Sequence, residues 1–133
     1  DYNTSGALIM TNDGDLAYRI THPKHEVYKT YRARVAGVLS NEKVAKLRKG
    51  VDIGGFVTSR AKVNVIKGNA HSTIVEISIH EGKNRQVRKM FAAVGNPVQE
   101  LERIAIGEIR LGHLKEGHYR KLTREEVEYL RNC

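Results

Sequence analysis

The sequence has few of the residues that build covalent frameworks, metal centres or membrane anchors. It contains one cysteine, Cys133, two prolines and no tryptophan among 133 residues. A single cysteine excludes an internal disulfide framework and a cysteine-based zinc site. It is also typical of a reducing compartment, so we expect a cytoplasmic location. No stretch approaches the roughly 20 apolar residues that cross a bilayer, so we expect no membrane partner.

Acidic residues are also scarce relative to basic ones. Asp and Glu number 15 and Lys and Arg 23, which leaves a formal net charge of +8 at pH 7. Such an excess on a small chain predicts a polyanionic partner, either nucleic acid or an anionic surface, although this charge can also serve solubility alone. With 40% hydrophobic residues, the chain can bury one core, so we expect a single domain over residues 1–133.

Hydrophobic periodicity predicts strands that helices interrupt irregularly. The strands that we expect cover residues 6–12, 27–38, 51–53, 56–66, 73–79, 98–106, 109–111 and 119–122. The helices that we expect run from Asp13 or Asp15 to Ile20, from Ser40 to Gly50, over 84–94, and onward from a capping box at 123–126. Because many turns have hairpin length, this order favours an α+β fold with a mainly antiparallel mixed sheet.

The segment 81–97, EGKNRQVRKMFAAVGNP, carries three cations at the start of a predicted helix. Its apolar positions recur at helical spacing and are expected on the core side: Val87, Met90, Phe91 and Val94. Arg85, Arg88 and Lys89 then point away from the core, at a helix start that suits phosphate groups. A solvated charged face explains the same pattern equally well, so the segment alone leaves both interpretations open.

A second candidate is the strand segment 29–34, where Tyr31 stands among Lys29, Arg32 and Arg34. Aromatic and basic residues interleaved in this way can stack on a base and hold its phosphates. The pattern alone favours the alternative, a half-buried strand whose Tyr31 packs in the core.

Metal-binding patterns are weak. Asp13 and Asp15 flank a glycine but lack the further acidic ligands of a calcium loop. His22 and His25 stand on either side of Pro23, which makes a shared helical face doubtful. We therefore expect no metal site.

Four segments, in the expected order, resemble the motifs of the pseudouridine synthases that modify ribosomal RNA. The first is DYNTSGALIMTNDGD at 1–15, and the second joins 22–24 to 29–31. The third is EGKNRQVRKM at 81–90, and the fourth joins 101–104 to Gly107, Leu111, Leu114 and Gly117. The matches cover essentially the whole chain, and the first and third are specific. The sequence is most similar to the branch of ribosomal large subunit pseudouridine synthase B.

The resemblance implies an isomerase that works without a cofactor, as a monomer, on ribosomal RNA. Its fold would be a bent, mainly antiparallel mixed sheet flanked by helices, with the site in a basic cleft. In the family a Gly-Arg-Leu precedes the catalytic aspartate. This chain begins at the position of the aspartate itself, with Asp1. We therefore expect the C-terminal major part of a catalytic domain, without its upstream strands or the small N-terminal RNA-binding domain, and with little activity by itself.

The resemblance also assigns roles to individual residues. Asp1 would act on the sugar as the catalytic carboxylate, Arg88 would pair with it, and Tyr31 would pack on the uracil. Leu101 would close the pocket around the base. The remaining cations would serve the phosphates: Lys29, Arg85, Lys89 and Arg103.

Two other functions stay open on the sequence. The first is a non-catalytic RNA-binding or ribosome-assembly module on the same fold, which would bind through the same basic surface without needing Asp1. The second is a structural domain that docks on another protein and has no salt-dependent affinity for RNA. Asp1, Tyr31 and Arg88 together favour the enzyme, because a pure binder has no use for an acid in a cleft that faces RNA.

Overall fold

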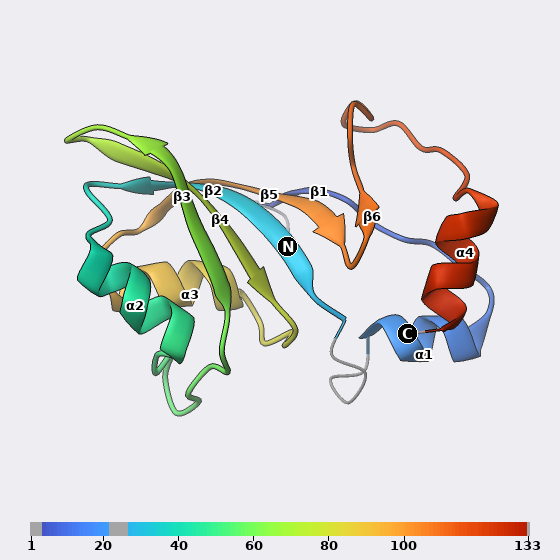
Figure 1. The fold of residues 1–133 in the computed structure, drawn as a ribbon, viewed down its shortest axis with the longest axis horizontal. Helices are drawn as coiled ribbons and strands as arrows, with labels where there is room; N and C mark the ends of the chain where they lie inside the picture. The colour runs from blue at the N-terminus through green and yellow to red at the C-terminus, as the bar shows by residue number, and fades with distance from the viewer. Residues whose placement is uncertain (1–3, 22–26, 133) are drawn as a thin grey trace.

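A mixed sheet of six strands organises the chain. The computed structural model describes residues 4–21 and 27–132. The sheet consists of β1 (Ser5–Gly6), β2 (Lys29–Ala36), β3 (Lys62–Gly68), β4 (Ser72–Ile79), β5 (Val98–Ile106) and β6 (Ile109–Arg110). Its order is β1-β5-β2-β4-β3, with β6 also paired to β5 (Figure 1). Only the pairing of β1 with β5 is parallel among these strands, which confirms the α+β prediction.

Helices α2 (Asn41–Lys49) and α3 (Gln86–Ala93) lie together on one face of the sheet (Figure 1). Side chains alternate along β2 and β4, so every second residue points toward these helices. Val35 of β2 and Ile77 of β4 are fully buried there, against Leu47 of α2 and Phe91 of α3. This main core holds the central strands and the start of α3 in a fixed relation.

A smaller core joins the two ends of the chain. Helices α1 (Gly14–Thr21) and α4 (Arg124–Arg131) pack beside each other, beyond the end of the sheet where β6 lies (Figure 1). Its buried members are Leu16, Ile20, Val27, Ile106, Ile109 and Leu130. No described helix has the length and apolar character needed to cross a membrane.

The helix starts predicted from capping residues are confirmed. Asp13 Oδ1 accepts a hydrogen bond from the Leu16 amide at 3.1 Å, and Ser40 Oγ accepts one from the Lys43 amide at 3.3 Å. Thr123 forms the reciprocal capping box of α4. These side chains satisfy amides that a helix leaves without internal partners.

The strand predicted over 6–12 is wrong beyond its first residue. β1 covers only Ser5–Gly6. Leu8 and Met10 are 74% and 86% exposed, whereas Ala7 and Ile9 pack partly against the smaller core. The segment thus alternates as a strand does, but within the described part of the chain no strand pairs with residues 8–12, and a strand needs a partner.

Three other predicted strands are shortened or missing. The strand predicted over 56–66 begins only at Lys62, and 51–53 contributes one isolated bridge, Asp52 to Val57. Asp52 Oδ1 accepts bonds from the amides of residues 54 and 55, which turns the chain there. Residues 119–122 form no strand: Arg120 bonds through its side chain to Glu126 and to the Arg110 carbonyl, and Leu122 packs partly against the smaller core.

Candidate functional site

A cavity of about 430 Å³ opens where β1, β2 and β5 approach the start of α3. Its size is within the range of small-ligand sites. One wall is the segment 4–8, which the parallel pairing of β1 with β5 holds in place. Gly6 is required at this contact, since its φ is +123° and a Cβ there would collide with the backbone of Arg103.

Six of the eight residues named from the sequence line this cavity: Lys29, Tyr31, Arg85, Arg88, Leu101 and Arg103. They come from β2, from β5 and from the start of α3, so segments far apart in the sequence meet here. Lys89 is not among the lining residues and lies exposed on α3. Asp1 lies outside the described residues.

The sheet register explains why the strand residues share one side. Tyr31 stands opposite Arg103 in the β2–β5 ladder, and Leu101 is two residues before Arg103 on the same face. A register shift between Thr30 and Tyr31 interrupts this ladder next to the cavity. Irregularities of this kind change the direction in which a strand presents its side chains.

Tyr31 combines the two interpretations that the sequence left open. It packs against the main core as a partly buried side chain, and it also lines the cavity. Packing on one side restricts the ring, while the other side stays available to a ligand. A ring restrained in this way is suited to stacking on a planar base.

The cavity is electropositive, and two of its cations, Lys29 and Arg88, have lowered pKa values. Burial lowers the pKa of Lys29, and the nearby charge of Arg103 lowers it further. Burial likewise lowers the pKa of Arg88, with a second contribution from Arg85. Cations placed this close repel one another, and an anionic ligand that entered the cavity would relieve that repulsion.

Two arginines connect the cavity to the segment around β1. Arg103 Nε donates to the Ala7 carbonyl at 2.7 Å, and the Ala7 amide donates back to the Arg103 carbonyl at 2.8 Å. Arg88 Nη2 donates to Thr4 Oγ1 over a longer 3.5 Å. The charges that face the cavity therefore also hold its wall.

Sequence reasoning missed two buried polar residues that border the cavity, Glu81 and Gln86. Gln86 precedes Met90 by one helical turn, so the periodicity places it on the core face of α3. A polar side chain on an apolar helix face was the signal that could have identified it. The helix predicted over 84–94 in fact begins at Gln86, because Arg85 adopts the left-handed conformation with φ +53°.

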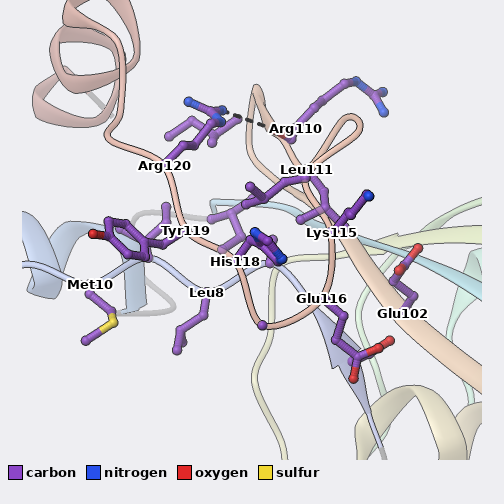
Figure 2. A pocket seen from close by; sticks show the side chains of 18 of the residues that line it. Leu8, Met10, Glu102, Arg110, Leu111, Lys115, Glu116, His118, Tyr119 and Arg120 are labelled. Atoms are coloured by element: carbon purple, nitrogen blue, oxygen red, sulfur yellow. Dashed lines mark hydrogen bonds between the residues drawn. The ribbon is translucent and has the colours of Figure 1, made fainter.

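A second cavity, of about 240 Å³, shares residues 5–8 with the first and is shown in Figure 2. Leu8, Met10 and Tyr119 are among the residues drawn around it (Figure 2). None of the predicted site residues within the described part of the chain lines this second cavity, so we place the candidate site in the larger one. The described residues contain no cluster of three or more His, Cys, Asp or Glu that could hold a metal ion.

An aromatic ring on the wall of a small cavity, with several cations around it, is a combination suited to a nucleotide. The sequence profile of the RNA pseudouridylate synthase family matches residues 1–93. The chain belongs to this family, as its motifs predicted.

Individual relatives agree with this assignment. Ribosomal large subunit pseudouridine synthase B of Bacillus subtilis is 41% identical over 133 residues, which cover 98% of this chain and 54% of the relative. Ribosomal small subunit pseudouridine synthase A of Vibrio vulnificus is 41% identical over 131 residues, or 96% of this chain and 55% of the relative. A crystal structure of a pseudouridylate synthase matches 98% of this chain and 56% of its own, with a TM-score of 0.86 and 37% identity. The chain thus spans about half the length of the curated relatives it matches.

Proposed function

We propose that the protein isomerises a specific uridine of ribosomal RNA to pseudouridine. The observation that carries the proposal is the cavity in which Tyr31, Leu101 and several cations meet. The relatives with 41% identity are named for the same reaction on ribosomal RNA. A uridine that reacts at its base has to leave the helical stack, and a cavity of this size accommodates a flipped base.

The reaction needs no net oxidation and no second substrate. The bond from the sugar C1′ to N1 breaks, the uracil turns, and a bond from C1′ to C5 forms. The proton on C5 leaves, and N1 gains one, so the composition is unchanged. Asp1 would act on the sugar as the carboxylate, and the Tyr31 hydroxyl would help to move the C5 proton.

Arg88 is proposed as the partner that keeps Asp1 ionised and oriented. The hydrogen bond from Arg88 to Thr4 supports this role, because Asp1 precedes Thr4 by three residues in the sequence. Lys29, Arg85 and Arg103 would hold phosphates next to the flipped nucleotide. Lys89, which lies outside the cavity, would contact a phosphate farther along the RNA.

The proposed substrate is large-subunit ribosomal RNA. The resemblance of the motifs favours the large-subunit branch, although a small-subunit enzyme is equally identical to this chain. The test is to map pseudouridines in both ribosomal RNAs of a strain without the gene, and again after complementation. We expect one large-subunit pseudouridine to disappear and return. Loss confined to the small-subunit RNA would contradict the choice of subunit, and no loss would contradict the function.

Complementation with Asp1→Asn separates catalysis from binding. We expect no pseudouridine at the site, with RNA affinity close to that of the wild type, because the amide keeps the size of the side chain but cannot act as a carboxylate. Retained modification would eliminate Asp1 as the catalytic group. If the protein were a non-catalytic RNA-binding module, Asp1→Asn would change neither the pattern of pseudouridines nor the affinity for RNA.

Arg88→Ala is expected to abolish the reaction as well. Its matched control is Arg124→Ala, which removes an arginine that is exposed at the start of α4. The control should retain normal activity, so equal losses in the two variants would reject the role of Arg88.

A further inference from the structure

The turn before α3 is held by two buried polar side chains. Glu81 is 7% exposed and Gln86 is 3% exposed. The Ser59 amide donates to both carboxylate oxygens of Glu81, at 3.2 and 3.0 Å, and Gln86 Nε2 donates to Glu81 Oε1 at 3.1 Å. A buried carboxylate is costly unless its oxygens are hydrogen-bonded, so these contacts favour one arrangement of the turn.

The other end of the Gln86 amide closes the same turn. The side-chain oxygen Gln86 Oε1 accepts a hydrogen bond from the backbone amide of Lys83 at 3.2 Å. The backbone amide of Gln86 donates in turn to the Lys83 carbonyl at 3.0 Å. The Lys83 ammonium also lies 4.5 Å from the centre of the Phe56 ring. The turn is therefore attached both to the start of α3 and to the segment 56–59.

Arg85 lies inside this closed turn in a conformation that is unfavourable by itself. It is the one non-glycine residue with positive φ among residues 4–21 and 27–132, at φ +53°. Such a conformation is strained for a residue with a Cβ and persists where its surroundings over-determine it. The bonds that Glu81 and Gln86 make on either side of Arg85 provide that determination.

We propose that Glu81 and Gln86 are positioning residues for the reaction, an inference that rests on the proposed function. By fixing the turn, they direct Arg85 to the cavity and start α3 at the residue that brings Arg88 to it. Neither residue has to touch the RNA. Their effect is to present two cations at the correct place before the substrate binds.

Exchanging the two side chain types tests this pairing. Gln86→Glu alone brings two carboxylates together and removes the amide donor, whereas Glu81→Gln alone brings two amides together. In the double variant E81Q/Q86E, the amide at position 81 can accept from Ser59 and donate to the carboxylate at position 86. That carboxylate can still accept from the Lys83 amide, so the bond between positions 81 and 86, one bond from Ser59, the bond from Lys83 and the net charge are restored. The second Ser59 contact and the weak bond from Gln86 to Met90 Sδ are not.

We expect kcat of the full-length protein on ribosomal RNA to fall roughly 10- to 100-fold in Gln86→Glu, the range for misplaced groups. The double variant should recover to within about threefold of the wild type, which a double-mutant cycle reports as coupling. Each kcat is expressed per mole of folded protein, with the folded fraction of each variant taken from its thermal unfolding curve. An unchanged kcat in Gln86→Glu, or a double variant no better than it, would overturn the proposal.

The matched control is Asn96→Ala. Asn96 is 2% exposed, and it bonds to Lys43 and to the carbonyls of Ala36 and Val38, away from the cavity. We expect this variant to lower the unfolding temperature without changing kcat per folded protein. A loss of kcat equal to that of Gln86→Glu would mean that any buried polar loss has this effect, and it would overturn the positioning role.

A readout without catalysis separates this inference from the proposed function. In Gln86→Glu, hydrogen exchange at the Lys83 amide should accelerate and the affinity for RNA should fall. Both should return to wild-type values in the double variant. If the wild type formed no pseudouridine but this exchange and affinity pattern held, only the proposed function would fail. If the wild type were active and the pattern absent, only the positioning role would fail.

Discussion

The contact at Gly6 determines one wall of the cavity, and Gly6→Ala tests it. Alanine at φ +123° costs on the order of 1–3 kcal/mol. The collision with the Arg103 backbone also removes the 2.8 Å hydrogen bond from the Ala7 amide, which contributes about 1 kcal/mol more. The smaller conformational freedom of alanine in the unfolded chain offsets about 0.4–1 kcal/mol. The net loss in the free energy of unfolding is therefore roughly 1–4 kcal/mol.

Urea unfolding of the full-length protein measures this loss. With an m-value of about 1.5 kcal/mol per molar, the midpoint should fall by roughly 0.7–2.7 M. If only the β1 edge detaches, the midpoint stays constant and hydrogen exchange at the Ala7 amide accelerates instead. In either case the cavity loses a wall, so formation of pseudouridine should decrease.

Gly14→Ala is the matched control. Gly14 lies at the start of α1, and a methyl group there would meet no atom within 4 Å. This variant should be as stable as the wild type or up to about 1 kcal/mol more stable. The reasoning is refuted if Gly6→Ala retains the wild-type midpoint, Ala7 exchange rate and activity.

Three further predictions concern charge and stacking. The pKa of Lys29 is lower in the folded protein than in the unfolded chain. The stability of the protein therefore rises as the pH increases from the folded to the unfolded pKa of Lys29, which means that the charged form of Lys29 destabilises the fold at neutral pH. Lys29→Met should therefore raise the unfolding temperature at pH 7, with no gain above the unfolded pKa, while it weakens RNA binding and lowers the salt slope by about 0.7. Hydrogen bonds from Arg120 and from the Thr123 amide lower the pKa of Glu126 to about 2, so the stability they contribute is complete above the unfolded pKa and is lost as the pH falls toward 2. Arg120→Ala should raise that pKa in an NMR titration. Tyr31→Phe should retain RNA affinity within about twofold, since stacking persists, but slow the isomerisation by roughly 10²-fold or more, whereas equal activity would exclude the hydroxyl from proton transfer.

Local signals predicted the ends of helices well. Asp13, Ser40 and Thr123 each cap the helix that follows them, since capping needs only a side chain and the next three residues. Gly50 ends α2 for an equally local reason, because glycine adopts the positive φ of +125° that the end of the helix requires. Predictions that depended on distant partners were less successful. Residues 8–12 and 119–122 have strand-like sequences, but pairing is a property of two segments, and in the described chain these two have no ladder.

The sequence by itself determined the family, the α+β class and the identities of the residues proposed for the site. Motifs specify residue types in order, and these features depend on order alone. Only the tertiary structure decided which of those residues meet, because the cavity forms from the β1–β5 pairing, the register of β2 on β5 and the start of α3. It separated Lys89, which lies outside the cavity, from Lys29, which lines it, although both belong to segments that match the family motifs. It also identified Glu81 and Gln86, whose proposed role depends on burial and on hydrogen bonds within a closed turn, which exist only once the chain has folded.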